Sequence, residues 1–287
     1  MSTAPRRSAP PRPSAPSRLR YTLTQLGVLA IILICIVVID ARWDRLLDLP
    51  ALSITYGQLM IGGVVQNPLV EPNLTYWSDA LRLMVESLQI AWVGTVIGAV
   101  LSFPIAFIAA STVAPRWAVF LTRQILNILR AIPELVLAIA IMLPIFGLGP
   151  LAGALAIGVG SVGTLGKLTA EAIESVPRGP GEALTAAGAT TLQKLRWAVV
   201  PQILPEVIAF WLYRFEINIR ASAILGVLGA GGIGSLLAQV FERRDWDRIG
   251  ITLVVIIVVT IIVDQISAAV RHRVISGAPA LSAKALV

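Results

Sequence analysis

The sequence contains too few charged residues for a soluble globular protein. Asp, Glu, Lys and Arg make up only 14% of its 287 residues, whereas 56% are hydrophobic. Soluble domains carry about 25% charged residues, which they need to cover their surface. Six membrane-spanning helices of roughly 20–25 residues would use about half of this length, which leaves too little chain for a sizeable soluble domain. The composition therefore predicts an integral membrane protein and excludes an autonomous cytosolic enzyme.

Residues that hold metals or perform catalysis are also scarce. The chain has one cysteine, Cys35, and one histidine, His272. A single cysteine excludes an intrachain disulfide, and a lone histidine between Arg271 and Arg273 lacks the partners of a metal site. The sequence contains no HExxH, CxxC or nucleophile-elbow motif. We therefore expect no catalytic residue, no metal site and no cofactor on this chain.

Two short glycine motifs resemble nucleotide-binding motifs, but the sequence around each of them does not fit a nucleotide site. Residues 229–234 read GxGxxG, yet a dinucleotide site needs a βαβ unit and an acidic residue about 20 positions further on. Here a short polar stretch and another apolar segment follow, which predicts a flexible turn. Gly166-Lys167 is followed by Leu168, and Ser161 occupies the place of the first glycine of a Walker loop. Neither motif is expected to bind a nucleotide.

Six long apolar segments divide the chain. They cover approximately residues 22–41, 86–111, 117–146, 151–175, 199–228 and 249–270. We predict one membrane-spanning helix for each of them, and a short interfacial helix at residues 53–65 within the polar connection 42–85. The predicted fold class is an all-α integral membrane protein with six transmembrane helices.

Charge and composition divide the chain into three parts. Residues 1–20 hold five prolines and five arginines with little that is apolar, which predicts a disordered tail. Residues 21–275 form the membrane domain, and residues 276–287 form a second tail. Lys and Arg are concentrated in the tails and in the loop 177–198, so the positive-inside rule places both termini and this loop in the cytoplasm. The net charge of +7 is then explained by membrane orientation, and no nucleic-acid partner is expected.

Ionisable residues within the apolar segments are expensive to bury and need an explanation. Three pairs of opposite charge lie four residues apart: Arg130 with Glu134, Lys167 with Glu171, and Glu216 with Arg220. This spacing places both members on one face of a helix, so we predict that each pair is neutralised within its own helix.

Arg214 has no acidic residue three or four positions away, and Asp264 in the last segment is also unpaired locally. Two alternatives follow. Asp264 pairs with Arg214 across helices, or Arg214 faces a translocation pathway and attracts an anion. In the second case Arg214, Asn218, Arg220 and Ser222 would line that pathway.

One loop between two apolar segments carries a recognisable motif. Residues 176–205 contain a Pro/Gly interruption, a short helix predicted to start at Glu182, a glycine and a second amphipathic stretch. By composition alone this is an ordinary amphipathic loop. The spacing of Glu182, Ala183, Gly188 and Pro201 resembles the EAA loop of ATP-binding-cassette importer permeases. Leu184 stands in place of the second alanine of that motif.

Two further segments resemble phosphonate-type permeases of that class. They are residues 215–234, FEINIRASAILGVLGAGGIG, and residues 130–134, RAIPE. Together with the number of helices, the resemblance covers approximately residues 20–275. It implies the type I permease fold in a bacterial inner, or plasma, membrane.

The resemblance also implies a function and partners. Two copies of the chain would form the pathway as a homodimer, two ATPase subunits carrying ATP and Mg would dock on the EAA loops, and a solute-binding protein would deliver the ligand. The chain itself would be no enzyme, and its cargo would be a phosphonate or a related oxyanion. Its coupling element would run from Glu182 through Ala189 and Lys194 to Leu195. Gly188 would permit a tight bend or a close approach, and Pro201 would shape the helix that follows.

Three other functions are alternatives to that of an oxyanion permease. A permease of the same class for another solute, such as methionine, shares the glycine-rich turn. An ion-coupled secondary transporter predicts inverted repeats, which the sequence does not show clearly. A membrane-embedded enzyme would need a metal or nucleophile constellation, and none is apparent.

Overall fold

The computed structural model describes residues 18–39, 41–66, 68 and 70–276. These residues are helical or irregular, with no strand among them. The chain divides into two compact units, residues 1–54 and 55–287. The first contains α1 (Arg18–Val38), a short 3₁₀ turn (Trp43–Leu46) and the start of α2 (Leu49–Val65). The predicted tails lie outside the described residues, apart from residues 18–20 and 276.

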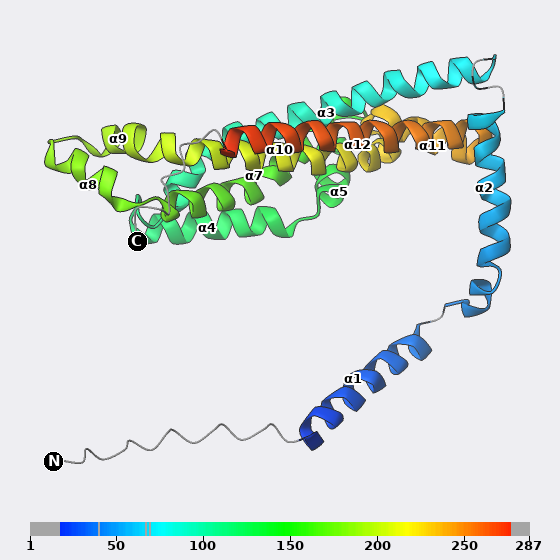
Figure 1. The fold of residues 1–287 in the computed structure, drawn as a ribbon, viewed down its shortest axis with the longest axis horizontal. Helices are drawn as coiled ribbons and strands as arrows, with labels where there is room; N and C mark the ends of the chain where they lie inside the picture. Colours follow the sequence, from blue (N-terminus) through cyan, green and yellow to red (C-terminus); the bar gives the residue numbers. More distant parts are fainter. Residues whose placement is uncertain (1–17, 40, 67, 69, 277–287) are drawn as a thin grey trace, which may run out of the picture. The chain divides into compact units, whose positions relative to one another are not determined.

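The second unit holds the other helices (Figure 1). They are α3 (Asn73–Ala109), α4 (Arg116–Ala131), α5 (Glu134–Leu137), α6 (Leu143–Phe146), α7 (Pro150–Ser175), α8 (Arg178–Ala186), α9 (Thr191–Lys194), α10 (Val200–Leu225), α11 (Gly232–Arg243) and α12 (Trp246–Ser276). Three π-helical turns join some of them: η2 (Ala138–Met142), η3 (Leu195–Val199) and η4 (Gly226–Ala230).

The described residues include five helices that are long and apolar enough to cross a membrane, or six if α4 and α5–α6 form one bent span. That bent pair corresponds to the predicted segment 117–146, and its two halves meet at 88°. Pro133 causes the break, because it cannot donate a helical hydrogen bond and holds the preceding Ile132 in an extended conformation, φ −82° and ψ 118°.

Two other segments differ from the prediction. Helix α3 begins at Asn73 rather than near residue 86, so it runs into the connection that the sequence analysis treats as polar. An ion pair of Asp79 with Arg248 of α12, 2.8 Å, fixes this additional part. The helix predicted at 53–65 is confirmed as α2, which begins four residues earlier.

Helix α11 is absent from the sequence prediction, which places a short polar stretch there. It forms because Ile233, Leu236 and Val240 recur at helical spacing and are buried. Its first N–H groups have no partners within the helix. The Glu86 carboxylate accepts from Gly232 N at 3.1 Å, and Ser87 Oγ accepts from Ile233 N at 2.9 Å. Helix α3 therefore caps α11.

Helix α7 lies in the middle of the unit, and glycines let its neighbours approach closely. A Cβ built on Gly98 of α3 would lie 2.5 Å from Ser161 Cβ, and one on Gly94 would lie 2.8 Å from Ile157 Cγ2. On another face of α7, a Cβ on Gly163 would lie 2.8 Å from the backbone nitrogen of Arg130 in α4. Small residues at helix contacts are the usual way in which membrane helices pack.

Candidate functional site

The loop with the recognised motif folds as two short helices, α8 and α9, which we call the α8–α9 segment (residues 178–194). Helix α8 begins at Arg178, four residues before the predicted start at Glu182. Pro177 occupies the N-cap, and Pro180 is tolerated because first-turn N–H groups have no helical partner. Glu182 therefore lies in the middle of α8, and the predicted helix start at Glu182 is wrong.

Gly188 ends α8 in the conformation that the motif requires. Its φ is +81°, a left-handed value that favours glycine. Gly188 N donates to Thr185 O at 3.0 Å, and Ala189 N donates to Leu184 O at 2.9 Å, which is a Schellman motif. A Cβ at Gly188 would meet nothing within 4 Å. The predicted tight bend is confirmed, whereas no close approach to another part of the described chain exists.

Helix α9 begins with a capping box that the sequence analysis missed. Thr190 Oγ1 accepts from Gln193 N at 3.4 Å, while Gln193 Oε1 accepts from Thr190 N at 2.7 Å. The signal is visible as Thr190-x-x-Gln193, the usual pattern of a helix start. Together the two motifs leave only four residues, 187–190, between the two helices.

The α8–α9 segment exposes apolar side chains. None of the residues of α8 is buried, and Glu182, Ala183 and Gly188 are exposed. Leu192 of α9 is 76% exposed, while Ala189 and Lys194 are half-buried. The segment extends beyond the ends of α7 and α10 (Figure 1). A projecting, exposed segment that carries a leucine of this kind is suited to docking against another protein.

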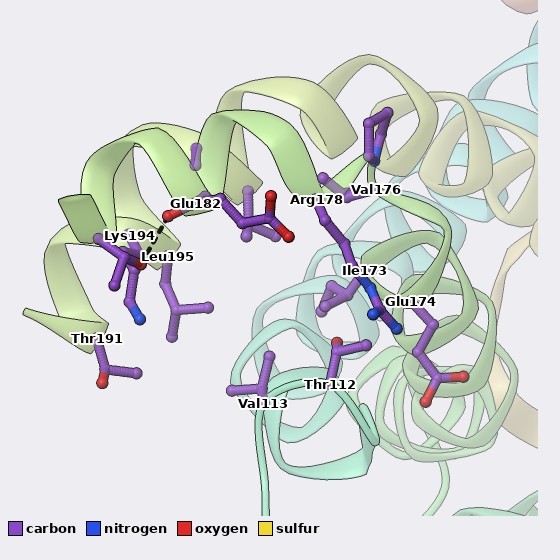
Figure 2. Close-up of a pocket in the computed structure, with 15 residues that line it drawn as sticks. Thr112, Val113, Ile173, Glu174, Val176, Arg178, Glu182, Thr191, Lys194 and Leu195 are labelled. Atoms are coloured by element: carbon purple, nitrogen blue, oxygen red, sulfur yellow. Dashed lines mark hydrogen bonds between the residues drawn. The ribbon is translucent and has the colours of Figure 1, made fainter.

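A cavity of about 420 Å³ lies beneath the α8–α9 segment. Figure 2 shows Arg178 and Glu174 on one side of it, Thr191 and Lys194 on the other, and Val113 between them. Its walls come from α8, α9, the end of α7 and the α3–α4 connection.

An ion-pair cluster fixes the base of this cavity. Glu174 Oε1 accepts from Arg123 Nη2 at 2.6 Å and from Ser111 N at 2.5 Å. Arg123 Nε also donates to Ala109 O, 2.9 Å, at the end of α3. The sequence gives no signal for this cluster, because its members belong to different helices and do not recur at a regular spacing.

The α8–α9 segment is joined to α10 without a break. Helical structure is continuous from α9 through the π turn η3 into α10. Pro201 occupies the first turn of α10, directly after η3. In a regular α-helix a proline ring clashes with the carbonyl group four residues earlier. The π turn before Pro201 provides the wider spacing that avoids this clash. Helices α9 and α10 therefore form one continuous helical element.

A buried polar network connects α10 with α3, α5 and α7. Arg214 forms an ion pair with Glu134 and donates from Nε to Ser161 Oγ at 2.9 Å. Asn218 Nδ2 donates to Thr95 Oγ1 at 2.8 Å and to Ser161 Oγ at 3.2 Å. Buried polar side chains of this kind hold membrane helices together.

None of the three charge pairs predicted within helices forms an ion pair in the described part of the chain. Glu134 pairs with Arg214 instead of Arg130, because Pro133 separates α4 from α5 and no common helical face exists. Glu216 pairs with Arg271 of α12 at 2.7 Å.

Arg220, the predicted partner of Glu216, pairs instead with Asp264 of α12 at 2.9 Å. Glu216 and Arg220 of α10 thus each pair with a residue of α12 rather than with one another. The alternative pairing of Arg214 with Asp264 is wrong as well. For Lys167 and Glu171, both exposed, the described part of the chain shows no ion pair within 4.0 Å.

The four residues proposed to line a pathway differ in their surroundings. Asn218 and Ser222 are fully buried, and Arg214 is 8% exposed. Ser222 Oγ donates to Ser87 O of α3 at 3.1 Å. The Arg220 side chain is 56% exposed. In this conformation Asn218 and Ser222 hold helices together, and a pathway role for the four residues stays a prediction.

Comparisons with known proteins agree with this geometry. Residues 102–276 match the family described as binding-protein-dependent transport system inner membrane component. The phosphite transport system permease protein PtxC of Stutzerimonas stutzeri is 37% identical over 87% of this chain and 89% of its own length. The phosphate-import permease protein PhnE of Mycolicibacterium smegmatis is 36% identical over 72% of this chain and 39% of its own.

A solved structure shares the fold. An inward-facing form of the MetNI methionine ABC transporter contains a chain with a TM-score of 0.63 and 22% identity, covering 72% of this chain and 99% of that one. This likeness supports the arrangement of the helices and carries no information on cargo.

Proposed function

Because this chain belongs to the family of binding-protein-dependent transport system inner membrane components, we propose that it carries phosphite, a phosphonate or a related oxyanion across the inner membrane. It is a multi-pass transport permease of the ABC importer class. The observation that carries the cargo proposal is the 37% identity with a phosphite permease over nearly its whole length. The methionine alternative has weaker support, since a probable D-methionine permease of Vibrio cholerae is 31% identical over only 52% of this chain.

The α8–α9 segment is the proposed docking element for a separate ATPase subunit. Its exposure and the 76% exposed Leu192 support this role. Glu182, Ala183, Gly188, Ala189 and Lys194 are its proposed contact residues. ATP and Mg would be bound by that subunit, so hydrolysis takes place outside this chain. The Lys and Arg excess in this loop favours a cytoplasmic location, on the same side as both termini.

The continuity of α9 with α10 supports a route for coupling. Closure of two ATPase subunits would displace the α8–α9 segments, and η3 with Pro201 would pass the displacement to α10. The buried contacts of Arg214 and Asn218 would then move α5 and α7 with it. Two copies of the chain, as a homodimer, would thereby alternate between inward-open and outward-open states while a solute-binding protein delivers cargo from outside.

Replacement of Leu192 by glutamate tests the docking proposal. The 76% exposed leucine lies at the tip of the α8–α9 segment, so a charge there should disrupt an apolar interface without disturbing the fold. We expect the recovery of the ATPase subunit, co-purified in mild detergent, to fall roughly tenfold or more.

Leu148→Glu is the matched control. Leu148 is 78% exposed and lies between α6 and α7, away from the α8–α9 segment. Its variant should retain the ATPase like the unmodified chain. Equal recovery with Leu192→Glu, or no recovery with the unmodified chain, would refute docking at this segment.

A further inference from the structure

Helix α4 has a polar face along its whole length, which is unusual in a membrane-spanning element. Arg116, Arg123, Asn127 and Arg130 recur at helical spacing on this face. The apolar side chains on the opposite side are exposed: Trp117, Leu121, Ile125 and Ile128. A membrane helix with one apolar and one polar face turns the apolar face toward lipid. Its polar face lies toward an aqueous space or a polar partner.

Arg130 lies level with the middle of α7, one of the helices long enough to cross a membrane. Its backbone packs against Gly163, which is 13 residues after Pro150 and 12 before Ser175, the two ends of α7. At 1.5 Å per residue, either end of α7 is about 20 Å away. Arg130 is exposed, and within the described residues its side chain has no ion pair or hydrogen bond. Contact of an unpaired guanidinium group with lipid is energetically unfavourable at this depth, so the group needs water or an anion as its partner.

The Arg130 side chain borders a cavity of about 340 Å³ at the bend between α4 and α5. Thr164 of α7 lines the same cavity, together with Glu134 and Arg214. The charge of Arg214 is already balanced by Glu134. Arg130 therefore gives the cavity a net positive charge, and the volume lies at the lower end of the range of small-ligand sites.

We propose that this cavity binds the transported oxyanion, with the Arg130 guanidinium and the Thr164 hydroxyl as its donors. Arginine presents a planar set of N–H groups that matches the oxygens of phosphite and phosphonate. The Arg214–Glu134 pair forms one wall of the cavity and takes a positioning role. Arg130 thus replaces Arg214 as the anion-binding residue. This inference rests on the proposed function.

A second polar cavity continues toward the α8–α9 side. It measures about 210 Å³, and its polar lining residues are Arg123, Asn127, Lys167 and Glu171. Arg123, Asn127 and Arg130 follow one another on the same face of α4, so an anion released from Arg130 would next meet Asn127 and Lys167. The order of these groups favours release at the cytoplasmic end.

Cysteine labelling tests whether the cavity is aqueous and holds the anion. In a Cys35→Ser background, which removes the natural cysteine, Ile132→Cys places a thiol in the lining of the cavity without removing a proposed donor. In the complex with its ATPase, this thiol should react with a charged, membrane-impermeant reagent. Phosphite should slow this reaction, and the protection should disappear when Arg130→Gln is added. Ile128→Cys, on the apolar face of α4, should stay unreactive. An unreactive Ile132→Cys, or protection that persists without Arg130, would overturn the proposal.

Uptake measurements separate this proposal from the proposed function. In proteoliposomes with the complete transporter, Arg130→Gln should lower phosphite uptake roughly tenfold or more, and Arg130→Lys should recover part of it. Arg82→Gln, which removes an exposed charge from α3 far from the cavity, should leave uptake unchanged. Normal uptake with Arg130→Gln would refute the site alone. If the unmodified transporter carries no oxyanion, the proposed function fails instead.

Discussion

Replacing Glu134 by alanine is expected to destabilise the chain by about 3–5 kcal/mol. The reason is that Glu134 is the ion-pair partner of Arg214, whose side chain is 10% exposed. Without the carboxylate, a buried guanidinium keeps only its bond to Ser161 Oγ and has no compensating charge. The measurement is the midpoint of thermal unfolding of the purified protein in detergent, followed as the loss of monodisperse protein.

A double variant distinguishes a lost ion pair from a general packing defect. In Glu134→Leu with Arg214→Met, both charges are replaced by apolar side chains, so we expect most of the stability to return. The single variant Glu134→Leu should stay as unstable as Glu134→Ala. If the double variant is no more stable than Glu134→Leu, the destabilisation has another cause.

Replacing Gly188 by valine is expected to abolish transport while the membrane domain stays folded. The left-handed φ of +81° is strained for a β-branched residue by about 1–3 kcal/mol, so the reversal between α8 and α9 should change its shape. A side chain at this position touches nothing else in the described chain, so the thermal stability of the helix bundle should be preserved. ATP-driven uptake and ATPase co-purification report the effect.

Gly188→Asn is the matched control, because asparagine adopts the left-handed conformation more readily than other non-glycine residues. We expect it to retain most of the uptake. Equal activity of the valine and asparagine variants would show that the geometry of the turn is unimportant. A loss of thermal stability with valine would show that the turn contributes to the fold.

The sequence predicts the features that depend on local patterns. Apolar runs locate the spanning helices, and a single glycine at the right spacing identifies the reversal at Gly188. The proline in Arg130-Ala-Ile-Pro133-Glu134 also has a local effect, since it breaks the helix. The sequence analysis overlooked that break and treated residues 117–146 as one segment, which led directly to the wrong pairing of Arg130 with Glu134.

Contacts between helices could not be predicted in this way. Arg214 with Glu134 and Arg220 with Asp264 are 80 and 44 residues apart, and which charges meet depends on how α5 and α12 pack against α10. The same holds for Arg123 with Glu174. The unpaired state of Arg130 follows from these choices, because its expected partner is taken by Arg214. The unpaired state of Arg130 can be recognised only when the structure shows which charged residues pair with one another.

ATP-driven uptake of phosphite is the most direct test of the account. The chain would be reconstituted into proteoliposomes with its ATPase subunit and its solute-binding protein. We predict uptake that requires ATP and the binding protein, and that stops when the ATPase cannot hydrolyse ATP. Uptake driven by an ion gradient without ATP would contradict the account and favour a secondary transporter. ATP-driven transport of methionine but not of phosphite would contradict the proposed cargo.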